Sequence, residues 1–305
     1  MARQRKGQKI DGWLVIDKPL GLSSSKVVGN VKHILNAQKV GHGGTLDPLA
    51  TGILPIGLGE ATKTMPYIVD ATKEYAFSVK WGTATDSDDK EGAVTQTGGR
   101  MPGEKEVLEA LPAFIGMIEQ TPPIYSAIKV DGQRAYKLAR DGETPEMKSR
   151  LVEIQDLSLV SHDTSTKETA FHVTCGKGTY VRSLGRDIAL SLGTCAHITA
   201  LRRLRVGPFT LKGAISLEKL EQLSHSARAV EVLLPLTTAL DDIPAVAVTE
   251  IEAQDIKYGR SVTLNAVKQG TLVLMAGDLP LAIAEAEEGL DGNVTVRPLR
   301  VFNMV

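Results

Sequence analysis

The feature that most constrains the fold of this chain is a glycine-dense stretch, GHGGTLDPLATGILPIGLGEATKT, at residues 41–64. Glycine has no Cβ atom, so it weakens regular elements and lets the backbone approach a ligand closely. Its glycines stand at positions 41, 43, 44, 52, 57 and 59, which makes a regular element improbable. We therefore predict a loop here, and Asp47 is the single carboxylate at the centre of its Gly41–Gly52 part.

The segments on both sides of this loop carry the patterns of regular structure. An apolar run at 14–16 stops at Asp17-Lys18-Pro19 and predicts a strand followed by a turn. From Ser25, apolar residues recur at helical spacing and predict a helix that ends near Gln38. Residues 75–81 alternate with a period of two, which predicts a half-buried strand. The predicted loop is thus anchored on both sides.

The rest of the chain alternates irregularly between strand and helix patterns. The predicted helices lie at 104–112, 181–192 and 216–222, and the predicted strands at 151–160 and 170–175. Residues 121–150 mix basic residues, tyrosines and glycines without a steady period. From about residue 245, short strand patterns follow one another: VAVTE, SVTL, TLVLM, LAIAEA and VTVRPLRVF. This order favours the α/β (α+β) class, with a mixed sheet and a small β-rich second domain.

Composition indicates a water-soluble cytoplasmic protein. The 305 residues exceed the ~100–200 of a typical domain, and 42% hydrophobic with 23% charged residues is ordinary for a globular chain. No apolar stretch approaches the ~20 residues that cross a bilayer, and the polar start lacks a signal-peptide core. Only Cys175 and Cys195 are present, too few for a disulfide framework. We expect a reducing cytoplasm and no membrane segment.

The charge is unevenly distributed along the chain. Residues 241–305 carry ten acids and five bases, a net −5, so the total of −1 leaves +4 on residues 1–240. A basic cluster opposed only by Asp187, with Tyr180 interleaved, consists of Lys177, Arg182, Arg186, Arg202, Arg203 and Arg205. Basic groups bind phosphates and aromatic rings stack on bases, so this cluster predicts a nucleic-acid surface. A solvated helix face is the alternative for Arg186.

Three motifs in the first hundred residues have simpler interpretations. Aspartate before proline often begins a turn, so Asp47 by itself would be only a turn residue. The segment 57–64, GLGEATKT, resembles a phosphate-binding loop, but Thr62 stands where a glycine must precede the lysine. The segment 86–92, DSDDKEG, has glycine at the seventh rather than the sixth position of a calcium loop, so we interpret it as a solvated turn and leave a functional role open. No zinc spacing is present, and we expect no metal.

Taken together, the motifs resemble those of the TruB-type pseudouridine synthases, which modify uridine 55 in the T-loop of transfer RNA. The residues that carry the resemblance are GWLVIDKP at 12–19, GHGGTLDPLATG at 41–52, KEY at 73–75, GTYVR at 178–182 and LRR at 201–203. Both their order and their spacing agree with the family. The resemblance spans most of the chain and makes chance a poor explanation.

The resemblance implies a fold and a domain organisation. It implies a mixed, mainly antiparallel central sheet flanked by helices, the pseudouridine synthase fold, over residues 1–240. It also implies a thumb-like RNA-binding insertion at about 121–150 and a small β-rich PUA-like domain at 245–305. In the family that last domain reaches the acceptor end of the RNA. Here the short stretch Arg297-Pro298-Leu299-Arg300 is the best basic candidate within an otherwise acidic segment.

The resemblance also implies roles for individual residues. Asp47 matches the catalytic carboxylate, Arg182 its ion-pair partner, and Tyr75 a ring that stacks on the target base. A second role of Tyr75, in removing the C5 proton, stays open, because a phenol with a pKa of ~10 is a poor base without help. A carboxylate held at the ribose can stabilise, trap or deprotonate the sugar while the glycosidic bond breaks. The matched motifs make further residues candidates for substrate binding: His42, which fills the space of the flipped base, Tyr180 and Leu201 in the uracil pocket, and Lys18, Gly43, Thr45 and Arg202.

The resulting hypothesis is a cofactor-free tRNA pseudouridine synthase that is monomeric and needs no protein partner. Its RNA partner would be the T-arm, with the acceptor end as a second contact. Whether Asp47 attacks C1′ or removes the C2′ proton stays open. Two other classes compete: a non-catalytic tRNA-folding chaperone, and a sugar hydrolase, which would need a second carboxyl group ~5 to 10 Å away.

Overall fold

Two sheets form the framework of the protein. The computed structural model describes residues 7–304 except 131, 227, 266 and 290–292. Within these residues the larger sheet has nine strands in the order β1-β3-β12-β4-β11-β10-β7, with β2 beside β3 and β13 beside β12. Their bounds are β1 Gly12–Lys18, β2 Val40–His42, β3 Ala50–Leu58, β4 Lys73–Trp81, β7 Gly116–Gln120, β10 Arg150–Asp163, β11 Glu168–Cys175, β12 Ala196–Val206 and β13 Phe209–Thr210.

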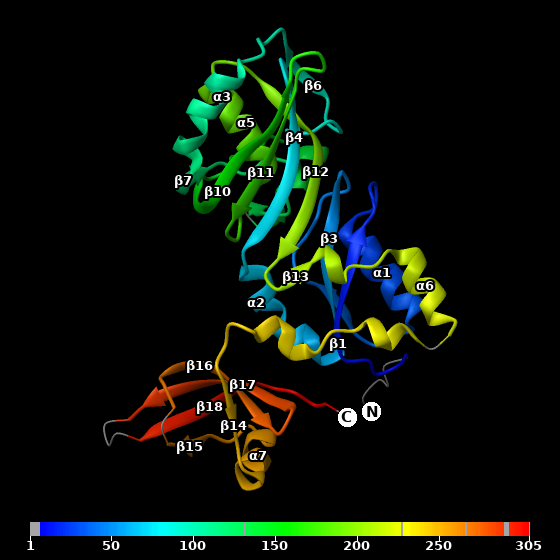
Figure 1. The fold of residues 1–305 in the computed structure, drawn as a ribbon, viewed down its shortest axis with the longest axis vertical. Helices are drawn as coiled ribbons and strands as arrows, with labels where there is room; N and C mark the ends of the chain where they lie inside the picture. The colour runs from blue at the N-terminus through cyan, green and yellow to red at the C-terminus, as the bar shows by residue number, and fades with distance from the viewer. Residues whose placement is uncertain (1–6, 131, 227, 266, 290–292, 305) are drawn as a thin grey trace.

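The pairing confirms the predicted mixed, mainly antiparallel sheet. Only β3 and β12 run parallel, over three residue pairs, and every other neighbouring pair in this sheet is antiparallel. Figure 1 shows α3 and α5 beside the β10–β11 part of the sheet, and α1 and α6 beside its β1 end. The helices are α1 Ser24–Ile34, α2 Met65–Asp70, α3 Glu104–Ala110, α4 Ala135–Arg140, α5 Val181–Ser191, α6 Leu217–Ser224 and α7 Glu250–Lys257.

The glycine-dense stretch is only partly a loop, so that prediction was wrong for much of its length. Residues 50–58 form β3, a central strand with eight of its nine residues buried, and 59–64 form a 3₁₀ helix. The glycines allow close packing within the strand rather than preventing it. A Cβ on Gly52, whose φ is +98°, would lie 2.1 Å from the carbonyl oxygen of Arg203 on β12. Only the turn at 43–49 keeps the predicted irregular backbone.

The elements around this stretch agree with their sequence patterns. The strand predicted at 14–16 is β1, and the strand predicted at 75–81 lies within β4. The predicted helix is α1, which begins after the Ser23 cap and ends at Ile34 rather than near Gln38. It ends earlier because Asn36 adopts a left-handed φ of 45°, which no helix continues through.

Residues 121–150 and the C-terminal segment contain more structure than their patterns indicated. The former holds the hairpin β8 Lys129–Val130 and β9 Gln133–Arg134 followed by α4. A further hairpin, β5 Thr83–Thr85 with β6 Val94–Thr97, follows β4. The predicted strand VAVTE ends at Ala247, because Thr249 caps α7 through a capping box with Glu252. That helix is absent from the sequence-based expectations.

The smaller sheet lies at the C-terminus and contacts the larger one through a shared apolar cluster. Its strand order is β14-β16-β17-β18-β15, with bounds β14 Ala245–Ala247, β15 Val262–Leu264, β16 Gly270–Ala276, β17 Leu279–Glu288 and β18 Val294–Val301. Trp13 and Ile53 of the larger sheet share this cluster with Ile283 and Phe302. Lys63 also donates to the carbonyl of Val301 at 2.7 Å. In the described part of the chain, no helix is long and apolar enough to span a bilayer.

Candidate active site

The turn that carries Asp47 connects β2 with β3. Hydrogen bonds from two buried polar side chains, Lys18 and Ser24, hold it in place. Lys18 Nζ donates to the carbonyl of Pro48 at 3.3 Å and to two carbonyls between β1 and α1. Ser24 Oγ accepts from the amide of Leu46 at 2.8 Å and donates to its carbonyl at 2.9 Å. The backbone on both sides of Asp47 is therefore fixed, while its carboxylate is about one-third exposed.

Lys18 contributes this support as a fully buried cation. Burial lowers the pKa of its ammonium from 10.5 to about 8, while the nearby Asp47 carboxylate acts in the opposite direction. Its contacts are all with carbonyl oxygens, which accept from an ammonium and supply no counter-charge. Lys18 thus acts on the turn backbone and does not line the cavity described below.

Asp47 is paired with a buried arginine. Nη2 of Arg182, in the first turn of α5, lies 2.9 Å from Oδ2 of Asp47. The arginine is 4% exposed and donates to the carbonyls of Ser87 at 2.9 Å and Tyr125 at 3.0 Å, with Asp89 Oδ2 at 3.5 Å. A guanidinium held at several points cannot swing away, so it fixes the direction of the Asp47 carboxylate.

The acidic segment 86–92 is not the solvated turn that was predicted. Ser87 and Asp89 are buried against the Arg182 guanidinium. Asp88, with a φ of 60°, accepts from Arg186 at 2.8 Å, and burial raises the pKa of its carboxyl to about 6. The acid density of the segment reflects this arginine-binding role, a signal that the sequence contained but that we had assigned to solvent.

Most of the predicted site residues line one cavity of about 870 Å³. Six of the ten are on its wall: Thr45 and Asp47 from the turn, Tyr75 from β4, Tyr180 and Arg182 at the start of α5, and Leu201 from β12. The segment 121–150 adds Tyr136 and Arg140. Arg150, at the start of β10, places its guanidinium carbon 5.1 Å from the centre of the Tyr180 ring. The cavity thus combines phenol rings and several cations with four carboxylates, those of Asp47, Asp86, Asp89 and Glu91.

Tyr75 lies on β4 and lines the same cavity as Asp47. It pairs with Arg203 across β12 and β4, so the two side chains share one face of the sheet. Burial raises the pKa of the Tyr75 phenol, and the positive charge of Arg203 opposes that rise. Without a compensating charge, such a phenol would be a poor proton acceptor.

His42 and Gly43 stand beside the cavity rather than on its wall. His42 is the last residue of β2, and burial lowers the pKa of its imidazole. Its Nδ1 is buried and has no hydrogen-bond partner among the described residues. A Cβ on Gly43 would lie 2.5 Å from Cγ2 of Ile68, so packing against α2 explains this glycine.

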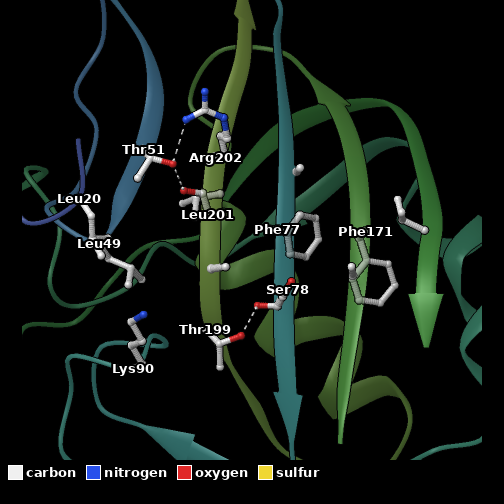
Figure 2. Close-up of a pocket in the computed structure, with 14 residues that line it drawn as sticks. Leu20, Leu49, Thr51, Phe77, Ser78, Lys90, Phe171, Thr199, Leu201 and Arg202 are labelled. Carbon is white, nitrogen blue, oxygen red and sulfur yellow. Dashed lines mark hydrogen bonds between the residues drawn. The ribbon is translucent and has the colours of Figure 1, made fainter. Parts of the chain in front are cut away.

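Arg202 faces the opposite side of the sheet. Its guanidinium forms two hydrogen bonds with Asp17, at 2.7 and 3.0 Å, and a third with Thr51 at 3.4 Å. Figure 2 shows Arg202 and Thr51 at a second cavity of about 400 Å³, together with Leu49 and Phe77. The structure therefore does not bring Arg202 together with Asp47.

The basic cluster does not form the shared RNA-facing surface that its spacing predicted. Most of its members are paired with acids from other elements: Lys177 with Asp70, Arg182 with Asp47, Arg186 with Asp88, Arg202 with Asp17 and Arg205 with Glu74. Arg203 is 1% exposed. Arg202 and Arg205 lie on one face of β12 and Arg203 on the other, and within the cluster only Arg182, Arg203 and Tyr180 line the cavity.

Comparison with known sequences gives a consistent picture. A sequence model described as the N-terminal domain of the TruB family pseudouridylate synthases matches residues 32–181, and one described as the tRNA pseudouridylate synthase B C-terminal domain matches 182–241. Proteins named tRNA pseudouridine synthase B from Rhodospirillum rubrum and Caulobacter vibrioides are each 49% identical to this chain. Both alignments cover 100% of this chain and 100% of the relative.

Solved structures share the fold. A chain of a Cbf5-Nop10-Gar1 complex superposes with a TM-score of 0.71 at 27% identity, covering 90% of this chain and 78% of the other. A chain of an H/ACA RNP bound to a substrate RNA containing 2′-deoxyuridine gives a TM-score of 0.75 at 23% identity, covering 100% and 92%. At that identity the second likeness bears on the fold alone.

Proposed function

The chain belongs to the TruB family of pseudouridylate synthases, and from this premise we propose that it converts uridine 55 in the T-loop of transfer RNA to pseudouridine, with Asp47 as the catalytic carboxylate. Family membership makes the chain a tRNA pseudouridine synthase, an isomerase. The observation that carries the finer proposal is the 2.9 Å pair of Asp47 and Arg182 on the wall of a cavity. Its volume of about 870 Å³ lies within the range of ligand pockets.

The reaction needs a fixed carboxylate at the ribose. When the bond between C1′ and N1 breaks, its electron pair leaves with the uracil and the sugar becomes electron-deficient. Asp47 either bonds to C1′ or removes the C2′ proton, and both routes require an ionised carboxylate. Arg182 pairs with the Asp47 carboxylate at 2.9 Å and fixes its direction. The uracil then turns, bonds to C1′ through C5 and loses the C5 proton.

The target uridine must leave the folded T-loop to reach Asp47. Flipping a base costs a few kcal/mol in lost stacking and pairing. Tyr75 would stack on the flipped base, with Tyr180 and Leu201 forming the walls around it. His42, beside the cavity with an unpartnered Nδ1, would occupy the vacated position in the RNA and offset part of this cost.

The remaining candidate residues support substrate binding in different ways. Thr45 lines the cavity and can contact the nucleotide directly. Gly43 lets the turn pack against α2, and Lys18 holds the turn backbone, so both position the site. Arg202 on β12 forms an ion pair with Asp17 on β1, outside the uracil pocket. We assign it an indirect role in binding.

The domain organisation completes the proposal. Residues 1–240 would be the catalytic domain, with 121–150 as a thumb that closes over the RNA through Tyr136 and Arg140. Residues 245–305 would be a PUA-like domain that reaches the acceptor end, with Arg297 and Arg300 as exposed basic contacts. We expect a monomeric cytoplasmic enzyme that needs no cofactor and no protein partner.

The structure offers a matched pair of variants for the test. Asp47 and Asp17 are both 37% exposed, and each is paired with an arginine, at 2.9 and 2.7 Å. Asp47→Asn should abolish pseudouridine formation on a T-arm transcript, whereas Asp17→Asn should retain most of it. Pseudouridine is mapped by base-specific chemical labelling and sequencing. The same mapping on transfer RNA from cells lacking the chain should show the loss at position 55.

Two outcomes would contradict this proposal. Pseudouridine formation by Asp47→Asn at the wild-type rate would remove the catalytic role of the carboxylate. A wild-type protein that refolds transfer RNA and leaves position 55 unmodified would favour the hypothesis of a non-catalytic chaperone. A sugar hydrolase would be recognised by its product, because it would release free uracil.

A further inference from the structure

Arg203 is a buried cation without a carboxylate partner among the described residues. It is 1% exposed, and its side chain donates to three carbonyls: those of Ile53 at 2.7 Å, Gly44 at 3.1 Å and Thr45 at 3.4 Å. Carbonyls satisfy its N–H groups and leave its positive charge uncompensated. An uncompensated buried charge destabilises a fold, so its presence calls for a functional explanation.

The position of Arg203 connects it with both parts of the proposed chemistry. Two of its carbonyl partners, Gly44 and Thr45, belong to the turn that carries Asp47. In the sheet, Arg203 pairs with Tyr75, and an irregularity in β12 immediately after it turns Arg205 to the opposite face. Bulges of this kind often direct a side chain toward an active site. Arg203 and Tyr75 both line the cavity.

The charge of Arg203 acts on five titratable groups around it. It lowers the pKa of the Lys73 and Lys18 ammonium groups and of the His42 imidazole, although burial is the larger cause in each case. It likewise lowers the pKa of the Cys175 thiol, which burial raises to about 11. At Tyr75, burial raises the phenol pKa, Arg203 lowers it, and Cys175 and Asp47 raise it. Arg203 is the cation that acts on this phenol.

We propose that Arg203 is a positioning residue of the isomerisation. Its guanidinium, which has no carboxylate partner among the described residues, holds the Asp47 turn. It also stabilises the phenolate form of Tyr75, which accepts the C5 proton. The inference rests on the proposed function. After C5 has bonded to C1′, the C5–H bond breaks and its electron pair restores the C5–C6 double bond. The proton passes to the phenolate oxygen, and N1 takes a proton from water. The phenol has earlier released its own proton to water.

The test separates charge from hydrogen bonding. Arg203→Gln keeps donors for the carbonyls and removes the charge, whereas Arg203→Lys keeps the charge. The ionisation of Tyr75 is followed without RNA, as the near-ultraviolet phenolate absorbance of each protein minus that of its Tyr75→Phe counterpart. Arg203→Gln should move the Tyr75 midpoint upward by about one pH unit, a tenfold change in the phenolate fraction. Arg203→Lys should leave it near the wild-type value.

Single-turnover rates on a T-arm transcript give the second readout. Arg203→Gln should slow the reaction by about tenfold, matching the loss of phenolate, with little change in RNA affinity. In a Tyr75→Phe background, which itself should bind RNA and lose most turnover, the same substitution should add little. Arg203→Lys should restore most of the rate, because the charge rather than the donor geometry supports Tyr75.

Each outcome decides the proposal. An unchanged Tyr75 midpoint in Arg203→Gln, or a full additional rate loss in the Tyr75→Phe background, would reduce Arg203 to a structural residue. If Arg203→Gln does not fold, Arg203→Lys decides, and an upward shift of its Tyr75 midpoint by a full pH unit overturns the inference. If the wild type fails to modify position 55, the proposed function fails, while the RNA-free titration still tests the effect of Arg203 on Tyr75.

Discussion

The Arg182 guanidinium lies 2.9 Å from the Asp47 carboxylate, although α5 and the β2–β3 turn are far apart in the sequence. The two partners differ in exposure, at 4% for the arginine and 37% for the aspartate. The cation is therefore part of the protein interior, and the carboxylate projects from it into the cavity. Little rearrangement is needed when a substrate arrives, which is the condition for electrostatic catalysis by fixed groups.

Arg182→Lys should be far from conservative. A lysine keeps the charge, but all its donors are on one nitrogen, whereas Arg182 reaches Ser87 through Nη1 and both Tyr125 and Asp47 through Nη2. We expect the single-turnover rate to fall by about a hundredfold or more, with RNA affinity within a few-fold of the wild type. Arg202→Lys is the matched control, because its partner Asp17 lies outside the cavity. Equal losses in both variants would argue against a special role for Arg182.

His42→Ala tests the base-flipping role. If the imidazole fills the position that uridine vacates, its loss should slow modification of a folded T-arm by about tenfold at most, a part of the flipping cost. An unstructured RNA of the same sequence should be affected less. The exposed His33 on α1 provides a control substitution to alanine. Equal slowing on folded and unstructured RNA would contradict the role.

Much of the fold was predictable because local patterns survive in the structure. α1, β4 and α5 carry clear periods, β1 carries a short apolar run that ends at a turn signal, and the structure has these elements where the sequence predicted them. β3 was missed because it is buried on both faces, so it lacks alternation, and because Gly52, Pro55 and Gly57 are typical of loops. The glycines serve tertiary contacts that no local pattern reveals.

Gly52→Ala should destabilise the protein through one such contact. The new Cβ would collide with the backbone of Arg203 and would also require a φ of +98°. Gly21→Ala is the control, because Gly21 has a φ of +84° and nothing within 4 Å of the added atom. We expect Gly52→Ala to lower the free energy of unfolding by about 2 kcal/mol more than Gly21→Ala. Denaturant unfolding measures both, and equal costs would mean that the backbone adjusts freely.

Lys18→Met should reveal the buried ammonium through its pH dependence. The folded-state pKa of about 8 is below the ordinary 10.5, so between these values the unfolded chain binds more protons here than the folded one. Lys18 therefore adds to the free energy of unfolding as the pH rises through this window, and the gain is lost as the pH falls through about 8. The stability of the wild type relative to Lys18→Met should rise accordingly. A constant difference across the window would contradict the lowered pKa.

From the sequence, only the site residues that belong to a family motif could be predicted. Asp47, Tyr75 and Arg182 came from the family resemblance, and the structure brings them to one cavity. The contributions of Ser24 and Asp89 were missed. Ser24 precedes the residues that carry the helical pattern and was given no role, and Asp89 was assigned to a solvated turn. Both act through partners remote in the sequence, which spacing alone cannot identify.

The apolar cluster that joins Trp13 with Phe302 has a consequence for how the protein is made. Strand β1 leaves the ribosome long before Ile283 and Phe302, which complete this cluster from the smaller sheet. Phe209 can pack on the Trp13 ring earlier, but the cluster stays open on one side until the smaller sheet has been made, and an exposed apolar surface on a nascent chain favours aggregation. Shortened products of the gene should accordingly precipitate or be degraded, rather than persist as a working catalytic half.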